Sequence, residues 1–94
     1  MKLAKEFVLT DHAQREISRR ELNEKLVISC IENPEQVVEG EYKRVIHQIK
    51  YQDTDKNQYI LRTIIDVKSN PKKVITVYKT SKIQKYWPEE TDES

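Results

Sequence analysis

The 94-residue sequence contains only one cysteine, one glycine and three prolines. A single thiol excludes an intrachain disulfide and is consistent with a reducing compartment. So few glycines and prolines argue against a linker-rich or disordered chain and favour a folded domain. No apolar run approaches the roughly 18 residues of a membrane-spanning helix, and residues 1–6 lack the apolar core of a signal peptide. We therefore expect a single cytoplasmic domain that makes no contact with a membrane.

Common catalytic motifs are missing as well. The sequence has no Gly-rich phosphate loop, no GxSxG, no HExxH and no CxxC pair, which argues against the usual forms of nucleotide binding, serine hydrolysis and zinc chemistry. A metal site would have to recruit His12, His47 and Cys30 from three separate segments, so we expect no metal and no cofactor. Cys30 stands in the apolar run 26–31 and is interpreted as a buried small hydrophobe rather than a nucleophile.

Charge is distributed unevenly along the chain. The formal net charge is +1, but residues 1–87 hold 17 basic and 12 acidic residues, a net charge of +5. Residues 68–85 contain six lysines and no acid, and residues 88–94 contain four acids and no base. The lysine run indicates either a polyanion-binding face or an ordinary solvated surface. We expect residues 88–94 to form a flexible acidic tail that shields this face or adds solubility.

The first third of the chain predicts two helices. The first covers about residues 12–20 and is capped by Thr10 or Asp11, and the second covers about residues 24–32 and is capped by Asn23. The pair Asn33-Pro34 ends the second helix because proline disfavours helical geometry in the residue before it. The segment 37–38 is either a short extended piece or a further turn of helix.

From residue 44 the apolar period changes to two, which predicts strands over about 44–51, 59–67 and 73–79. Short loops between successive strands favour an antiparallel meander. The predicted fold class is α+β, with two N-terminal helices packed on one face of a three- to four-stranded antiparallel sheet. The other sheet face would then be available for function.

One group of candidate residues would suit RNA cleavage without a metal. Attack by a 2′-hydroxyl on its own phosphate needs a base, an acid and cations for the added charge. His12 suits acid or base work because its unperturbed pKa lies near neutrality. Arg15 and Arg19 follow it on the same helical face and could hold phosphate with two nitrogens at once. The alternative interpretation of His12 is a solvent-exposed residue at the start of a helix.

A second group comes from the strands. Arg62 interrupts an apolar strand, where a charge is costly unless it is paired, so it either pairs with Asp66 on the same strand face or lines a phosphate site. Thr76 and Tyr78 share a strand face and either offer hydroxyls to RNA or belong to the core. His47 lies between Val45 and Ile49 on one strand face and is interpreted as a hydrogen-bonded core or edge histidine rather than a ligand.

The C-terminal segment supplies the predicted RNA-binding residues. The lysines that could hold phosphate are Lys79, Lys82 and Lys85. Tyr86 and Trp87 could stack on unpaired bases, as could Tyr78. Aromatic residues in strands are also common in cores, and that alternative applies to Tyr78.

Four short motifs resemble an uncharacterised family of small bacterial domains. They are H-A-x-R at residues 12–15, N-P-E-x-V at 33–37, L-R at 61–62 and T-V-Y at 76–78, within about residues 10–87. That family looks like a relative of the RelE and BrnT toxins in the barnase–EndoU–colicin–RelE ribonuclease superfamily. The resemblance implies two N-terminal helices over a curved antiparallel sheet, with a ribonuclease site on the sheet face. The site residues that it implies are His12, Arg15, Arg62, Thr76 and Tyr78, with Tyr86 as a late aromatic.

Two hypotheses of different classes follow. The first is a toxin-like, RelE-like α+β domain over residues 1–87 that binds RNA and could cleave it without a metal. The second is a non-enzymatic interaction domain of a phage or mobile element that keeps the toxin-like fold and binds an antitoxin or another protein. Because 94 residues bury only a modest core, a homodimer is also considered.

Overall fold

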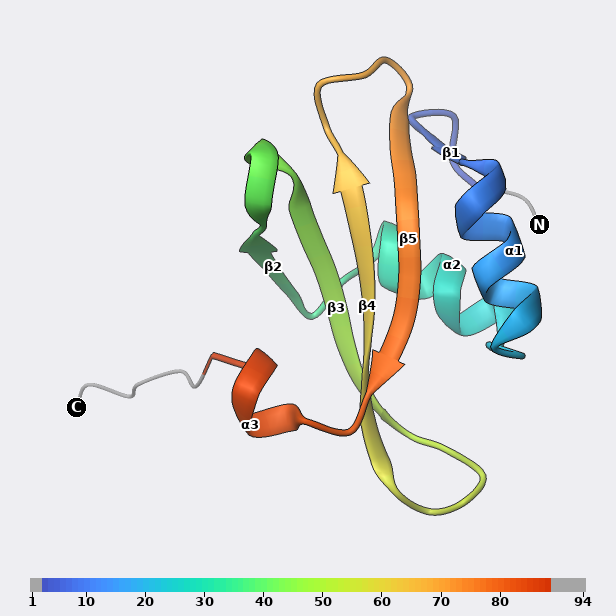
Figure 1. Ribbon diagram of the computed structural model, residues 1–94, viewed down its shortest axis with the longest axis vertical. Helices are drawn as coiled ribbons and strands as arrows, with labels where there is room; N and C mark the ends of the chain where they lie inside the picture. Colours follow the sequence, from blue (N-terminus) through green and yellow to red (C-terminus); the bar gives the residue numbers. More distant parts are fainter. Residues whose placement is uncertain (1–2, 89–94) are drawn as a thin grey trace.

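A five-stranded mixed sheet forms the centre of the computed structural model, which describes residues 3–88 (Figure 1). The elements in chain order are β1 (Phe7–Leu9), α1 (Asp11–Arg19), α2 (Glu24–Glu32), β2 (Gln36–Glu39), the 3-10 turn η1 (Glu41–Lys43), β3 (Val45–Gln52), β4 (Gln58–Asp66), β5 (Lys72–Thr80) and α3 (Ile83–Tyr86). The α+β class and the two N-terminal helices are confirmed. Of the predicted tail, everything after Pro88 lies outside the described residues.

The strands are arranged in the order β1-β5-β4-β3-β2. Strands β2 to β5 form the predicted antiparallel meander, but β1 pairs with β5 in parallel, with Val8 opposite Lys73. The prediction of a three- to four-stranded antiparallel sheet is therefore corrected to a five-stranded mixed one. Strand β1 was missed because three residues are too short to show a period of two, and its partner is distant in the sequence.

Both helices begin at side-chain caps. The Thr10 hydroxyl accepts a hydrogen bond from the Ala13 amide at 3.1 Å, so Thr10 rather than Asp11 is the cap of α1. The same hydroxyl donates to the Val74 carbonyl at 3.1 Å and thereby joins α1 to β5. Asn23 caps α2 as predicted, because its side chain accepts from the Leu26 amide at 3.1 Å.

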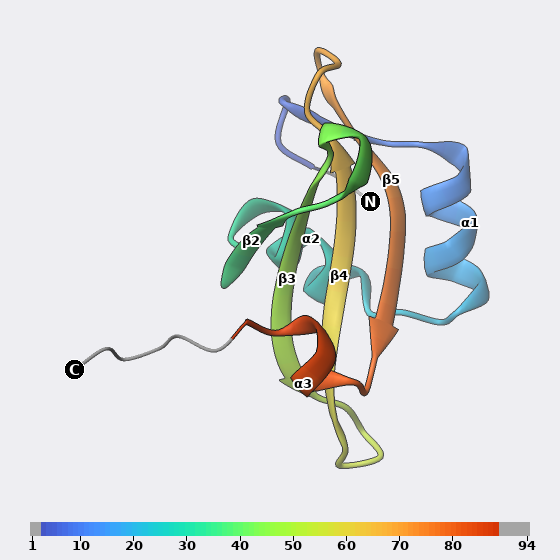
Figure 2. The same ribbon diagram turned by 60° about the vertical axis from the view of Figure 1, so that its left-hand side comes forward.

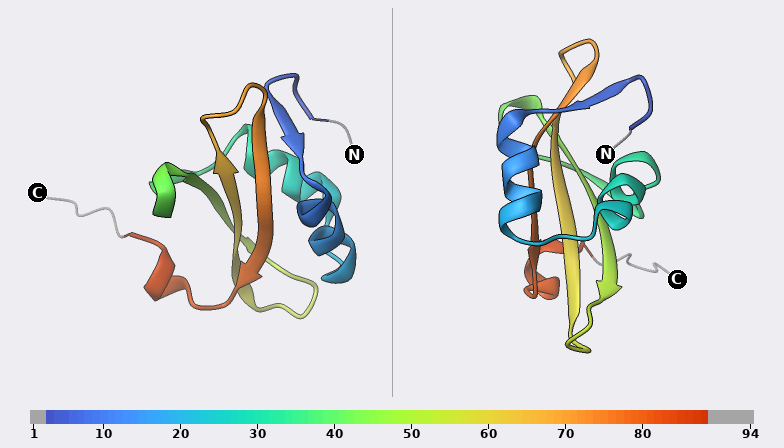
Figure 3. Two further views of the ribbon diagram at one scale, coloured as in Figure 1. Left: turned by 45° about the horizontal axis from the view of Figure 1, so that its top comes forward. Right: turned by 90° about the vertical axis from the view of Figure 1, so that its right-hand side faces the viewer.

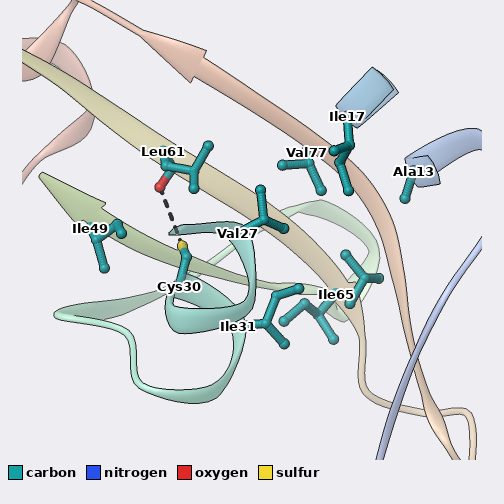
Figure 4. Close-up of a cluster of buried hydrophobic side chains, with 10 residues drawn as sticks. Ala13, Ile17, Val27, Cys30, Ile31, Ile49, Leu61, Ile65 and Val77 are labelled. Atoms are coloured by element: carbon teal, nitrogen blue, oxygen red, sulfur yellow. Dashed lines mark hydrogen bonds between the residues drawn. The ribbon is translucent and has the colours of Figure 1, made fainter. Parts of the chain in front are cut away.

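The hydrophobic core lies between one face of the sheet and the helices α1 and α2 (Figures 3 and 4). Its buried side chains are Ala13, Ile17, Val27, Cys30, Ile31, Ile49, Leu61, Ile65, Val74 and Val77. The thiol of Cys30 contacts the Leu61 carbonyl at 3.5 Å, and burial raises the pKa of this thiol to about 12. Such a thiol is protonated at neutral pH, which confirms that Cys30 is a buried hydrophobe.

His47 belongs to the same side of the sheet. Its Nδ1 lies 2.9 Å from the Ile31 carbonyl oxygen, and its ring meets Phe7 edge to face with the ring centroids 6.3 Å apart. Burial lowers the pKa of the imidazole, so the ring is neutral at neutral pH and Nδ1 donates to the carbonyl. His47 is therefore a half-buried, hydrogen-bonded histidine at the edge of the core, in agreement with its interpretation as a structural residue.

The opposite face of the sheet is partly covered by two short segments. The helix α3 follows β5 and lies over this face, and the turn η1 lies over its other end, beside β3 (Figure 2). Neither segment was predicted, because four and three residues are too few for a helical period. No helix of residues 3–88 is long and apolar enough to cross a membrane.

Candidate nucleic-acid interface

Arg62 is the central residue of the sheet face opposite the core. It lies in the middle of β4 and is only 7% exposed. The strand register places Gln48 of β3 on one side of it and Tyr78 of β5 on the other, and Gln36 of β2 lies next to Gln48. Four polar side chains therefore lie in one line across four strands. We call them the polar row, which consists of Gln36, Gln48, Arg62 and Tyr78.

Hydrogen bonds connect the polar row. The Nε of Arg62 donates to Oε1 of Gln48 at 2.9 Å, and its Nη1 donates to the Tyr78 hydroxyl at 2.5 Å. The side-chain amide of Gln48 donates to Oε1 of Gln36 at 2.9 Å. Since every buried polar side-chain atom of residues 3–88 has a partner, the row keeps a fixed geometry.

The helix α3 covers Arg62 with an aromatic ring. The Cζ of Arg62 lies 4.2 Å from the centroid of the Tyr86 ring, a typical cation–π distance. The carbonyl of Tyr86 accepts from the Gln48 side chain at 2.9 Å, and that of Pro88 accepts from Gln36 at 3.0 Å. The predicted late aromatic Tyr86 thus lies beside Arg62, which also contacts Tyr78.

Arg62 has no carboxylate partner within residues 3–88. The ion pairs of these residues join Glu16 to Arg19 and Arg20, and Asp53 to Lys79. Asp66, the predicted partner of Arg62, accepts instead from the Lys68 amide at 2.9 Å. The Nη2 of Arg62 has no hydrogen bond among the described residues, in contrast to its Nε and Nη1.

This environment is unusual for a buried charge. Burying a guanidinium is costly unless an anion compensates it, and here neutral amide, hydroxyl and aromatic groups surround it. An external anion at Nη2 would supply the missing compensation. Phosphate fits the planar, forked donor set of arginine well.

Further cations surround α3. The Nζ of Lys50 lies 4.6 Å from the Trp87 ring centroid, and the Nζ of Lys85 lies 5.1 Å from that of Tyr86. Lys82 and Lys85 are exposed, as the RNA-binding prediction requires. Lys79 differs, because it lies on the core side of the sheet and its Nζ contacts Asp53 at 2.7 Å.

The predicted site residues divide into two groups. Arg62, Thr76 and Tyr78 share the face opposite the core, since the register pairs Arg62 with Tyr78 and Thr76 with Ile64, two residues along β4. His12 and Arg15 are exposed on α1, which packs on the core side through Ala13 and Ile17 (Figure 3). The sheet therefore lies between the two groups, and the structure does not bring them together.

Arg19 has a local partner on α1. Its Nη2 lies 2.8 Å from both carboxylate oxygens of Glu16, and Arg20 binds the same carboxylate. These two arginines lower the pKa of Glu16 to about 2, so the carboxylate is ionised across the neutral range. The cationic stripe predicted for α1 is therefore partly neutralised.

Sequence reasoning missed Gln36 and Gln48. Gln48 is fully buried, although glutamine is usually exposed. The available signal was its position in the alternating strand, on the same face as the polar neighbour Lys50 and opposite the apolar face. Its pairing with Arg62 depends on the register of β3 with β4, which the sequence alone does not show.

A separate cavity of about 450 Å³ lies between β1, α1 and α2. Apolar side chains including Phe7, Leu9 and Leu22 line it, with Glu21 and Glu24 among its polar residues. None of the predicted site residues borders it. Acidic groups without a cation do not suit an anionic ligand, so we place the candidate interface at the polar row.

The fold and this face define a small α+β domain with an arginine-centred polar surface. The family model described as "Domain of unknown function (DUF4258)" matches residues 9–79. The chain belongs to this family, which confirms the resemblance to an uncharacterised family of small domains. The matched segment includes Arg62 and Tyr78 and ends before α3. Searches of curated proteins and of solved structures gave no match.

Proposed function

We propose that this chain is an RNA-binding domain of RelE-like fold that holds the RNA backbone at the polar row. The observation that carries the proposal is the environment of Arg62. This residue is 7% exposed, and its guanidinium lacks a carboxylate partner within residues 3–88. Its Nη2 and the neighbouring side chain of Tyr78 would contact one phosphate group. A resemblance to toxin-like ribonucleases implies a site on the same sheet face.

The surroundings of Arg62 favour RNA over a small free anion. Lys50, Lys82 and Lys85 are exposed and would contact further phosphates, which contribute most of the affinity of such complexes. Tyr86 and Trp87 bring aromatic rings to the same end of the face. The combination of cations and aromatic rings is typical of surfaces that bind unpaired nucleotides.

The geometry supports binding better than cleavage. Acid–base catalysis works best with a group that titrates near neutral pH, and the polar row offers an arginine, a tyrosine and two glutamines. His12, the predicted acid or base, lies on the other side of the sheet. The competing proposal of a protein-interaction domain would need an apolar patch at the centre of this face, and that centre is occupied by Arg62.

The decisive experiment measures RNA affinity by fluorescence anisotropy over a range of salt concentrations. We expect Arg62→Gln to weaken binding about tenfold or more, because it removes charge-assisted hydrogen bonds to phosphate. It should also lower the slope of log affinity against log salt by about one. Lys25→Gln, which removes one charge from the exposed side of α2, is the matched control and should leave binding unchanged.

Folding and activity controls accompany this measurement. Circular dichroism checks that Arg62→Gln is folded, and Tyr78→Phe serves as a second variant that removes only the hydroxyl bonded to Arg62. Incubation of RNA with the protein in EDTA tests for metal-independent cleavage. The proposal is overturned if the folded protein does not bind RNA at low salt. It is also overturned if His12→Ala and Arg15→Gln abolish binding while folded Arg62→Gln retains it.

A further inference from the structure

The turn between β2 and β3 lies on the same side of the sheet as the polar row. A Cβ atom at Gly40 would stand 3.1 Å from Cδ1 of Ile46, so the backbone of the turn contacts the Ile46 side chain. Ile46 shares its strand face with Gln48, two residues along β3. Figure 2 shows η1 and α3 over this same face, at different ends of it.

The turn is held in an unfavourable backbone conformation. Tyr42 and Lys43 have φ values of 58° and 61°, in the left-handed region that bulky side chains avoid. Two hydrogen bonds close the turn, from the Gly40 amide to the Arg44 carbonyl at 2.8 Å and from the Arg44 amide to the Glu41 carbonyl at 3.1 Å. Residues in sparsely populated backbone conformations cluster at active sites and ligand-binding sites.

The strain of the turn is not offset by burial of the Tyr42 side chain. Tyr42 is 79% exposed, the most exposed of the large hydrophobic residues described. The Cζ of Arg44 lies 5.8 Å from its ring centroid, and Lys43 adds a second cation. The turn therefore presents to solvent an aromatic ring that lies beside Arg44, with Glu41 before it and Lys43 after it in the sequence.

We propose that Tyr42 stacks on an unpaired base of a single-stranded RNA whose backbone is bound at Arg62. This inference rests on the proposed function and specifies its substrate class. Arg44, which lies beside Tyr42, and Gln48, which bonds to Arg62, are four positions apart at the start of β3, about 13 Å at the rise of a strand. One phosphate group cannot bridge that distance, so the two contacts involve different nucleotides of one strand. A duplex would present no free base face to Tyr42.

The test compares the affinities of Tyr42 variants for a single-stranded RNA of about ten nucleotides. Tyr42→Leu removes the aromatic ring and should weaken binding about tenfold, as expected for the loss of one base stack. Tyr42→Phe keeps the ring and should bind like the natural protein. Tyr59→Leu makes the same change on the core side of the sheet and is the matched control, with unchanged binding expected.

Two further ligands distinguish this inference from the proposed function. A nucleoside monophosphate is too short to reach both contacts, so its affinity should depend on Arg62 and not on Tyr42. A duplex RNA should also show no dependence on Tyr42. If Arg62→Gln weakens binding of the single strand while Tyr42→Leu binds it normally, the stacking role is overturned and the proposed function stands. If the folded protein binds no RNA, both are overturned.

Discussion

Arg62 and Cys30 show how differently burial acts on two ionisable residues of one small domain. Cys30 lies among apolar groups, where loss of water raises its pKa to about 12 and suppresses the reactive thiolate. Arg62 is almost as buried, but Gln48, Tyr78 and Tyr86 surround it with oriented dipoles and a ring face. The thiol of Cys30 is therefore protonated and inert, whereas the guanidinium of Arg62 is held by neutral partners.

The lowered pKa of Glu16 predicts how the stability of the folded protein changes in acid. Arg19 and Arg20 lower its pKa to about 2, below the ordinary value of 4.5. A carboxylate with a depressed pKa stabilises the folded state above pH 4.5, and that contribution is lost as the pH falls toward 2. We expect Glu16→Gln to melt at a lower temperature than the natural protein at pH 7 and at nearly the same temperature at pH 2.

Thermal unfolding followed by circular dichroism between pH 7 and pH 2 checks this expectation. Glu39→Gln, on the exposed side of β2, is the control, and its melting temperature should follow that of the natural protein throughout. A constant difference between Glu16→Gln and the natural protein would show that the side chain acts through packing rather than charge.

At the scale of elements, caps and register position the polar row. Each helix begins at a capping side chain, and the meander from β2 to β5 aligns Gln36, Gln48, Arg62 and Tyr78. A slip of one residue in any pairing would turn that strand's polar residue toward the core. The apolar residues of the opposite face oppose such a slip, so the core also fixes the geometry of the site.

Substitution of Thr10 tests the hydrogen-bonded connection between α1 and β5. Its hydroxyl caps α1 and also donates to the Val74 carbonyl, whereas the side chain of Asn23 caps α2 through the Leu26 amide. We expect Thr10→Ala to lower the free energy of unfolding by about 2 kcal/mol and Asn23→Ala by about 1 kcal/mol. Thr10→Ser should retain most of the stability.

Urea unfolding of the three variants provides these free energies. Equal losses for Thr10→Ala and Asn23→Ala would mean that the bond from Thr10 to β5 contributes nothing beyond the cap.

At the scale of the whole molecule, the sheet separates the hydrophobic core from the candidate interface. The face toward α1 and α2 carries the core, and the other face carries the polar row, η1 and α3 (Figures 1 and 2). Neighbouring residues of β5 consequently lie on opposite faces of the sheet. Val77 is fully buried in the core, and Tyr78 bonds to Arg62.

This separation predicts opposite outcomes for two adjacent substitutions. Val77→Ala removes two buried carbon groups and should lower the free energy of unfolding by about 2 kcal/mol, with RNA affinity unchanged. Tyr78→Phe should weaken RNA binding severalfold with a smaller effect on stability. Urea unfolding and fluorescence anisotropy on both variants check the pair, and a loss of affinity in folded Val77→Ala would contradict the separation.

Much of the fold was predictable because it depends on local patterns. The helix from Glu24 to Glu32 was predicted at its observed bounds, and β3, β4 and β5 were predicted within one residue. Alternation of apolar residues is a local signal, as is a capping side chain. The candidate site was predictable only in part, since Arg62 and Tyr78 were identified while their partners Gln36 and Gln48 were not.

The sequence by itself determined the α+β class, the two capped helices and the apolar core face, because each follows from residues close together in the chain. Only the tertiary structure decided which candidate residues meet. It joined Arg62 to Tyr78 and Tyr86 and placed His12 and Arg15 on the other side of the sheet. It also added β1, whose partner Val74 is 65 residues from Leu9. Pairing over such distances depends on register and on the packing of α1 and α2, which no local pattern encodes.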